Sequence, residues 1–135
     1  MPSKENAILD EGFYCLRHYG WFVFPRVWPR GVKAEWPVLD PKHYVGVAWR
    51  ANSGAVRMGK HFVRFGGAPG LGDIQGWEFK GGRFLNLEGK TATGKTNKDQ
   101  TKRLALSEKT GSISGIFRCY ADVEAIMKKW GFERR

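Results

Sequence analysis

The spacing of apolar residues along the chain predicts three helices. In residues 3–19, apolar side chains recur at helical spacing, Ser3 stands in the N-cap position, and Gly20 follows the last turn. A second helix is predicted over about residues 97–109, and a closing helix over residues 122–130. The long middle of the chain is therefore left for strands and loops.

Strands are predicted where β-branched and aromatic residues run together between turn residues. These runs cover residues 21–24, 44–49, 58–65 and 113–119, and two more flank a Gly-Gly pair at 81–82. Read along the chain, the order of elements is α-β-β-β-α-β with a closing helix. This order predicts an α/β fold.

Residues 25–41 show neither helical nor strand periodicity. The stretch is rich in proline and holds Trp28 and Trp36, with too few aliphatic residues for a core of its own. We predict an ordered extended loop rather than a flexible linker, because its aromatic side chains need a surface to pack on. Exposed large aromatics usually mark contact sites, so the loop either contributes to a homodimer interface or folds back as a lid on its own domain.

Gly81-Gly82 lies between two apolar-rich runs and predicts a two-residue hairpin loop, because both loop positions require positive φ. Such a loop places Asp73 opposite Lys90, and Gln75 opposite Glu88. Opposed residues share a sheet face, as do residues two apart on one strand. Asp73, Glu88 and Lys90 therefore point the same way, with the two carboxylates about 7–8 Å apart at Cα.

Two carboxylates and one ammonium at this spacing suit phosphodiester chemistry. Mg²⁺ and Mn²⁺ prefer oxygen ligands, and Mg²⁺ keeps several waters, so a carboxylate pair plus the substrate phosphate is a sufficient ligand set. The metal ion would activate water and neutralise charge on the phosphate, and Lys90 would stabilise the same charge. The hairpin therefore predicts a metal-dependent phosphodiesterase.

The charge of the chain points to a polyanionic partner. Its 135 residues suit a single domain, and 23 Lys and Arg against 13 Asp and Glu give a formal net charge of +10. An excess of this size favours nucleic acid over a membrane surface. The basic residues expected to contact DNA are Arg50, Arg57, Lys60, Arg64, Lys95 and Lys98.

Cysteine and histidine usage offers no further site. Cys15 and Cys119 are isolated in apolar contexts, without the spacing of a zinc site or a disulfide framework. His18, His43 and His61 lack ligand spacing relative to one another. No signal peptide and no apolar run of transmembrane length is found, so we expect a soluble, cytoplasmic protein.

A second motif competes with the nuclease interpretation. Residues 89–96, Gly-Lys-Thr-Ala-Thr-Gly-Lys-Thr, fit the P-loop pattern GxxxxGK[ST] between a predicted strand and a predicted helix. A P-loop normally ends an early strand of a parallel sheet, and later strands complete that sheet and supply a Mg²⁺-binding Asp. Only 39 residues follow Thr96. A P-loop nucleotide hydrolase is therefore the less favoured alternative.

Several motifs together resemble the VRR-NUC branch of the PD-(D/E)XK nuclease superfamily. They are Gly-x-x-Asp-Ile-x-Gly, then Gly-Arg-Phe-Leu-x-Leu-Glu-x-Lys ending at Lys90, then Gly-Lys and Gln100. The similarity runs from about Arg50 through the final helix and returns in the first helix, whereas residues 25–41 lie outside it as an insertion. One departure is Gly89, where a β-branched residue is usual.

The resemblance implies a role for each matching residue. Asp73 and Glu88 match the metal-binding carboxylates, and Lys90 matches the lysine of Glu-x-Lys. Gln100 matches the glutamine of the following helix and is expected to orient Lys90 or a bound water.

Glu5 matches the acidic residue of the first helix, and the resemblance implies an outer metal ligand there. A first-turn acid stabilised by the helix dipole is the alternative for Glu5. Glu11 shares a face with Ile8 and Cys15 and is a weaker candidate for the same place.

The resemblance also implies the fold and the function. The fold is a restriction-endonuclease-like core, with a mixed central sheet flanked by helices. Standalone members from viruses and bacteria resemble Holliday junction resolvases and act as homodimers. The implied function is a Mg²⁺- or Mn²⁺-dependent endodeoxyribonuclease, structure-selective for branched DNA, in the bacterial or host cytoplasm. A non-catalytic nucleic-acid-binding module stays open beside it.

Overall fold

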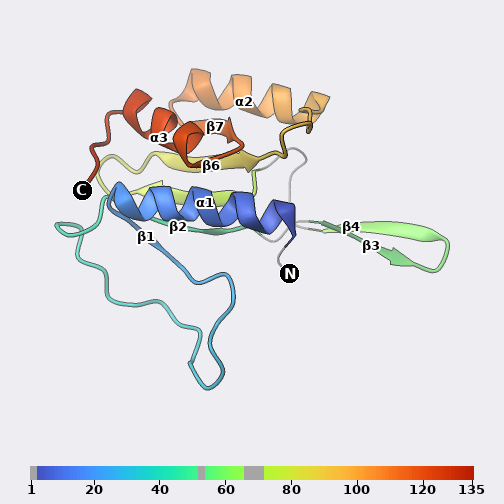
Figure 1. The fold of residues 1–135 in the computed structure, drawn as a ribbon, viewed down its shortest axis with the longest axis horizontal. Helices are drawn as coiled ribbons and strands as arrows, with labels where there is room; N and C mark the ends of the chain where they lie inside the picture. The colour runs from blue at the N-terminus through green and yellow to red at the C-terminus, as the bar shows by residue number, and fades with distance from the viewer. Residues whose placement is uncertain (1–2, 52–53, 66–71) are drawn as a thin grey trace.

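A computed structural model describes residues 3–51, 54–65 and 72–135, with the side chains of residues 54–57 and 62–65 left out. Within these residues the α/β class is confirmed, as a five-stranded mixed sheet flanked by three helices (Figure 1). Two residues expected to contact DNA, Arg57 and Arg64, have side chains outside the described part. No helix in the described ranges combines the length and the apolar character needed to cross a membrane.

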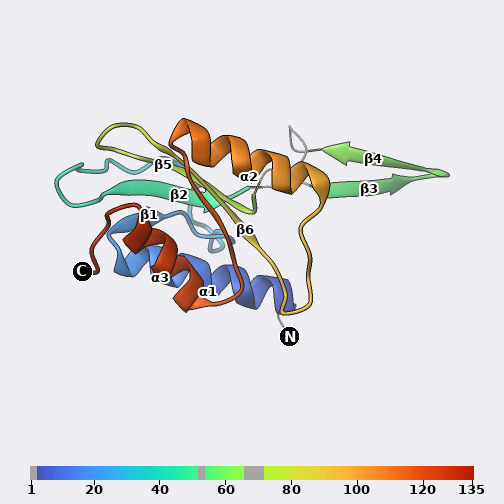
Figure 2. The same cartoon turned by 90° about the horizontal axis from the view of Figure 1, so that it is seen from above.

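The three predicted helices are confirmed, with ends within two residues of the predicted ones. α1 spans Lys4–His18, and the Ser3 hydroxyl accepts a hydrogen bond from the Asn6 N–H at 3.1 Å as its N-cap. α2 spans Lys98–Thr110 and α3 spans Tyr120–Lys129. In Figure 2, α1 and α3 lie on one side of the sheet and α2 lies on the other.

The central sheet has the strand order β1-β2-β5-β6-β7. β1 is parallel to β2 and β6 is parallel to β7, whereas β5 is antiparallel to both of its neighbours. The strands are β1 Trp21–Val23, β2 Gly46–Arg50, β5 Ile74–Glu78, β6 Phe84–Gly89 and β7 Ile113–Phe117.

The main core lies between the sheet and the helix pair α1 and α3. A Cβ at Gly12 of α1 would lie only 2.7 Å from the Phe117 ring, so the glycine lets the helix lie close on the sheet. This close packing brings the first turn of α1 to the end of β6. The buried side chains of the core include Leu9, Leu16, Ile74, Leu85, Leu87, Ile113, Phe117, Val123 and Met127.

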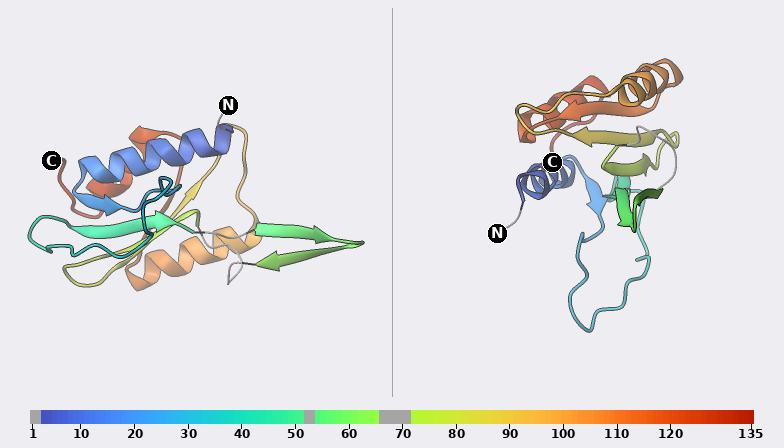
Figure 3. Two further views of the ribbon diagram at one scale, coloured as in Figure 1. Left: turned by 90° about the horizontal axis from the view of Figure 1, so that it is seen from below. Right: turned by 90° about the vertical axis from the view of Figure 1, so that its right-hand side faces the viewer.

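The strand predicted over residues 58–65 is wrong. The chain instead forms two antiparallel strands, β3 Gly54–Met58 and β4 His61–Phe65, with Gly59 between them at a φ of 64°. They make a separate two-stranded sheet that projects beyond the central one (Figure 3). The run of strand-forming residues looks continuous in the sequence, and the reversal depends on one left-handed glycine.

The predicted β5–β6 register is wrong by two residues. Gln75 pairs with Asn86 rather than with Glu88, and continuing the ladder sets Asp73 level with Glu88 rather than with Lys90. Because strand side chains alternate with a period of two, a shift of two residues keeps every side chain on its predicted face. The common orientation of the two carboxylates and the lysine therefore does not depend on this error.

The hairpin loop has four residues, 79–82, instead of the predicted two. The Glu78 N–H donates to the Arg83 carbonyl oxygen at 2.8 Å and closes this loop. Gly81 and Gly82 do have positive φ, 92° and 68°, as the turn prediction required. The two additional loop residues account for the register shift.

Residues 25–41 form an extended loop that packs on its own sheet through aromatic contacts. The Trp36 ring centroid lies 4.7 Å from that of Phe24, 6.4 Å from that of Trp49 and 5.8 Å from that of Trp77. Because Trp77 of β5 lies four residues after Asp73, which directly precedes the strand, these indoles cover the sheet face on which Asp73 lies. Trp36 stays 60 % exposed. A contribution of this loop to a homodimer stays a prediction.

Candidate active site

β6 ends where α1 and α2 begin, at one end of the central sheet (Figure 1). A cavity of about 240 Å³ is lined there by residues from α1, from β2, from the position directly before β5, and from the end of β6 with the segment that follows it. Five residues singled out from the sequence line this cavity, namely Glu5, Arg50, Asp73, Glu88 and Lys90.

Asp73 stands directly before β5 and is held by the backbone on both sides. Its carbonyl oxygen accepts from the Ala51 N–H at 2.8 Å, and its Oδ2 accepts from the Gly89 N–H at 2.8 Å. Burial raises the pKa of the Asp73 carboxyl, and the charge of Glu5 adds to the rise, whereas the Gly89 N–H opposes it. The carboxylate is thus fixed in place in surroundings that disfavour its charge.

Gly89 departs from the pattern that the sequence resembles, and the structure gives a physical reason for a small residue here. A Cβ at this position would lie 3.2 Å from the Phe117 ring and 3.5 Å from Asp73 Oδ2. The first distance is tight and the second is an ordinary van der Waals contact, so a larger side chain here would press on the Phe117 ring of the core.

Glu88 is 6 % exposed and lies on the sheet face that carries Asp73. Its Oε1 accepts from Gln100 Nε2 at 2.8 Å and lies 3.6 Å from Lys90 Nζ. Its Oε2 is buried and has no hydrogen-bond partner among the described residues. Burial and the Asp73 charge together raise the pKa of Glu88 to about 7, against the opposing charges of Lys90 and Arg103. The charge of Glu88 is therefore only partly compensated by the described residues.

Gln100 is oriented by the capping box of α2. Its Oε1 accepts from the Asn97 N–H at 3.1 Å, and Asn97 Oδ1 accepts from the Gln100 N–H at 2.8 Å. This arrangement leaves the amide nitrogen of Gln100 to donate to Glu88. Gln100 is buried, with 8 % of its surface exposed. It contacts Glu88, the carboxylate that Lys90 also approaches, and it therefore positions Glu88 rather than Lys90 itself.

Lys90 follows β6, and its position is fixed by the neighbouring strand. The Lys90 N–H donates to the Phe117 carbonyl oxygen at 3.0 Å, which ties this residue to the end of β7. Its side chain is 17 % exposed and lines the cavity beside Glu88. The ammonium therefore combines a defined place next to the carboxylates with access to the cavity.

Arg103 is a site residue to which the sequence analysis gave no role. It lies one turn after Gln100 on α2, a spacing that puts both on one helix face. Burial lowers the pKa of Arg103, while the Glu88 and Asp73 carboxylates oppose that fall. The sequence contained one signal for Arg103, its spacing of three residues from Gln100. That spacing indicates a site residue only when α2 is known to pack on the sheet.

Asn86 is a second residue that the sequence did not single out. It is 1 % exposed, and its Oδ1 accepts from the Gly72 N–H at 2.6 Å. A Cβ at Gly72 would lie 2.2 Å from the same oxygen, so only glycine fits there. Asn86 thus fixes the backbone immediately before Asp73 from the adjacent strand.

The structure separates the two acidic candidates on α1. Glu5 is exposed in the first turn of α1 and lines the cavity. Glu11 lies elsewhere, because its Oε1 accepts from the Tyr120 N–H at 3.3 Å, at the start of α3. Only Glu5 of this pair lies close enough to influence the Asp73 carboxyl.

The segment that fits the P-loop pattern has its own internal hydrogen bonds. The Gly94 N–H donates to the Thr91 carbonyl oxygen at 3.0 Å, and Arg118 donates to the Gly94 carbonyl oxygen at 2.8 Å. α2 begins only at Lys98, after the Gly-Lys-Thr triplet. A P-loop cradles phosphates with free backbone N–H groups, so this geometry disfavours nucleotide binding here.

The remaining predicted DNA contacts differ in their surroundings. Arg50 lines the cavity, and its Nη1 donates to Asn6 Oδ1 at 3.2 Å. Lys60 is exposed in the β3–β4 turn, Lys95 in the loop before α2, and Lys98 in the first turn of α2. These three lysines remain candidate phosphate contacts.

The residues present fit a small divalent cation. No group of three His, Cys, Asp or Glu in the described ranges is arranged to hold a metal ion. Mg²⁺ does not require such a group, since one or two carboxylates with waters and a substrate phosphate suffice. Asp73 and Glu88 converge on one cavity, and the buried, unpartnered Oε2 of Glu88 lacks the positive partner that a cation would provide.

No known protein family, curated protein or solved structure matches this chain. The function is therefore inferred from the geometry and chemistry of the cavity.

Proposed function

We propose that this protein is a divalent-metal-dependent endodeoxyribonuclease with a PD-(D/E)XK-like core. One observation carries the proposal. Asp73, Glu88 and Lys90 converge on one cavity, and Glu88 keeps a buried oxygen without a partner among the described residues. A carboxylate pair with unmet charge can hold the metal ion of a phosphodiester hydrolysis, and an ammonium beside it can stabilise charge on the phosphate.

Each side chain has a defined part in this proposal. Asp73 and Glu88 would hold Mg²⁺ or Mn²⁺, which when bound lowers the pKa of water and neutralises charge on the scissile phosphate. Gln100 keeps the Glu88 carboxylate in one orientation through its 2.8 Å hydrogen bond. Lys90 stabilises negative charge that develops on the phosphate. Glu5 provides a further carboxylate in the wall of the cavity.

The proposed substrate is branched DNA, such as a Holliday junction. The formal net charge of +10 supports a nucleic-acid partner. Lys95 and Lys98 come shortly after the cavity-lining residues in the sequence. A homodimer would present two related cavities to the two symmetry-related strands of a junction. The projecting β3–β4 hairpin, with Lys60 at its turn, would extend the basic surface beyond the sheet (Figure 3).

Cleavage of labelled DNA tests the proposal. Four-way junction, duplex and single-stranded DNA are each incubated with the protein in Mg²⁺, in Mn²⁺ and in chelator. We expect cleavage only with metal, and fastest on the junction. Binding of DNA without cleavage in any metal would instead identify a non-catalytic binding module, and light scattering with junction DNA tests the dimer against the 15.3 kDa of one chain.

A further inference from the structure

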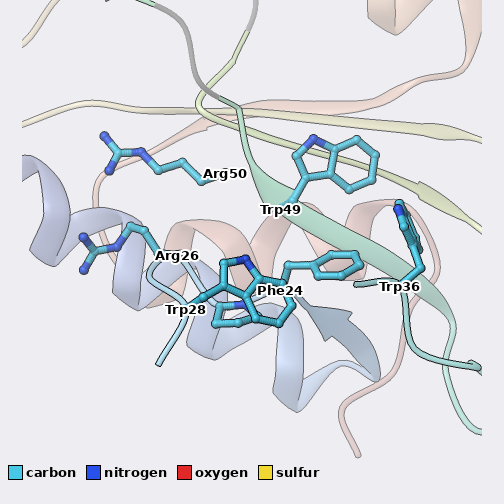
Figure 4. A pocket seen from close by; sticks show the side chains of 7 residues that line it. Phe24, Arg26, Trp28, Trp36, Trp49 and Arg50 are labelled. Carbon is cyan, nitrogen blue, oxygen red and sulfur yellow. The ribbon is translucent and has the colours of Figure 1, made fainter. Parts of the chain in front are cut away.

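A second cavity, of about 480 Å³, lies next to the carboxylate cavity. Its volume falls within the roughly 300–1,000 Å³ that is typical of small-molecule sites. Aromatic rings and two arginine side chains make up most of its described lining (Figure 4). The lining residues are Phe24, Pro25, Arg26, Trp28, Trp36, Trp49 and Arg50, and we name this cavity the aromatic pocket.

The aromatic pocket shares a lining residue with the proposed active site. Arg50 lines both cavities. Trp49 pairs with Gln75 across β2 and β5, so it is a diagonal neighbour of Asp73. Diagonal neighbours in an antiparallel sheet lie about 7–8 Å apart at Cα. A ligand that contacts Trp49 would therefore lie on the strand next to Asp73.

The rings of the pocket hold one another in place without parallel stacking. Phe24 meets Trp36 at an interplanar angle of 79° and Trp28 at 53°, and Trp36 meets Trp49 at 73°. Contacts of this kind fix the orientation of each ring while leaving ring surface free to contact a ligand. Trp36 is 60 % exposed despite its contacts, so the cluster is not simply a buried core.

The charge of the pocket favours an aromatic ligand that carries a negatively charged group. Of its described lining residues, two are arginines and none is acidic. Arg26 Nη2 also lies 3.3 Å from the Asp10 carboxylate outside the lining, so a phosphate would share this guanidinium with Asp10. Figure 4 shows the Arg26 and Arg50 side chains toward one side of the pocket, with the Trp36 and Trp49 rings on the other. Aromatic rings that stack on a base and arginines that contact its phosphate are the combination by which proteins bind single-stranded nucleic acid.

We infer that the aromatic pocket receives an unpaired nucleobase of the DNA strand whose phosphate lies at Asp73 and Glu88. This inference rests on the proposed function and adds that the branched substrate presents an unpaired nucleotide next to the cleavage site, as a flap does or as a junction does when a base pair opens at its branch point. The base stacks on the indoles of Trp28, Trp36 and Trp49, and Arg26 and Arg50 contact the adjoining phosphate. Residues 25–41 are thus a substrate-binding segment of the enzyme.

Binding in chelator tests the inference apart from cleavage. One labelled DNA carries a single-stranded flap, the other is a blunt duplex, and the flap contains 2-aminopurine as a fluorescent base. The variants are Trp28→Leu and Trp36→Leu, which remove a ring but keep an apolar side chain. Trp36→Phe keeps a ring, and Phe84→Leu removes an aromatic that lies 39 % exposed outside the pocket.

We expect both leucine variants to weaken binding of the flapped DNA by about 5- to 150-fold, the factor that loss of one stacked base implies. Blunt-duplex affinity should stay within about twofold, and quenching of 2-aminopurine by the wild type should be lost. Trp36→Phe should keep most of the affinity, and Phe84→Leu all of it. Circular dichroism and urea unfolding confirm that each variant is folded.

The outcomes separate the two proposals. If the wild type cuts DNA but the leucine variants bind flapped DNA as it does, the aromatic pocket is not a base site and the nuclease proposal stands. If the variants instead turn a dimer into a monomer without changing flap affinity, the surface is a subunit contact and the inference is overturned. If the wild type neither binds nor cuts any of the DNAs, the proposed function itself fails.

Discussion

Replacing Glu88 with glutamine gives the sharpest test of the carboxylate cavity. The glutamine has nearly the shape of a protonated glutamate, and its side-chain oxygen can still accept from Gln100 Nε2. The change removes a negative charge that burial and Asp73 both disfavour. We therefore expect Glu88→Gln to stabilise the metal-free protein at neutral and alkaline pH while it abolishes cleavage.

The size of the effect follows from the pKa of Glu88, which is raised from 4.5 to about 7. Between these values the folded protein binds a proton that the unfolded chain has released, so the free energy of unfolding falls as the pH rises. At about 1.4 kcal/mol per pH unit, the wild type loses roughly 3 kcal/mol across this window, and Glu88→Gln should not lose this contribution.

Urea unfolding in chelator at pH 5 and at pH 8 measures the difference. We expect the two proteins to be similar in stability at pH 5 and Glu88→Gln to be more stable by about 3 kcal/mol at pH 8. Mg²⁺ at 100 times its dissociation constant should stabilise the wild type by about 2.7 kcal/mol, and Glu88→Gln should respond little. The matched control is Glu108→Gln, because Glu108 is an exposed carboxylate that pairs with Lys129 on the surface.

Two results would refute the reasoning. A Glu88→Gln variant that is less stable than the wild type at pH 8 would show that the charge of Glu88 is already well compensated. Equal stabilisation of both proteins by Mg²⁺ would show that the ion binds elsewhere. The first result would remove the unmet charge on which the metal site is based, and the second would place the ion outside the carboxylate cavity.

Three further predictions concern the lysine of the cavity, the capping box of α2 and the positive charge of the chain. Lys90→Ala should lower cleavage by at least about 100-fold while DNA binding persists. Lys95→Ala, which removes a candidate phosphate contact outside the cavity, should weaken DNA binding but cut at nearly the wild-type rate at saturating DNA; the reverse order of cleavage rates would favour a P-loop. Gln100→Ala removes the acceptor of the Asn97 N–H and the donor to Glu88. The free energy of unfolding in urea should fall by about 1–2 kcal/mol, and cleavage should slow. An unchanged unfolding midpoint would contradict the capping role. The logarithm of the DNA association constant should fall linearly with the logarithm of salt concentration. Lys60→Ala and Lys98→Ala should each reduce the slope of this plot by about 1. A flat plot would contradict the interpretation that the positive charge serves to bind nucleic acid.

The sequence by itself determined the element types and the face on which the catalytic candidates lie. Helical and strand periodicity located all three helices and the central strands, because these patterns reflect which side chains each element buries. The orientation of Asp73, Glu88 and Lys90 was correct although the hairpin register was wrong. A two-residue shift does not change the face of any side chain, so alternation made this prediction robust.

Turns were less predictable than periodic elements, because a single glycine can reverse the chain without changing its apolar pattern. Gly59 divides residues 58–65 between two strands, although the run reads as one. The four-residue loop at 79–82 depends on how the flanking strands pair, and the Gly-Gly pair alone favours a shorter loop.

Only the tertiary structure decided which distant residues meet. The docking of α1 places Glu5 at the cavity and turns Glu11 to the start of α3. The docking of α2 sets Gln100 against Glu88, and the folding of residues 25–41 onto the sheet builds the aromatic pocket beside Asp73. Periodicity reports the faces of one element at a time, whereas these contacts depend on strand order and on the packing of complete elements, which local sequence does not specify.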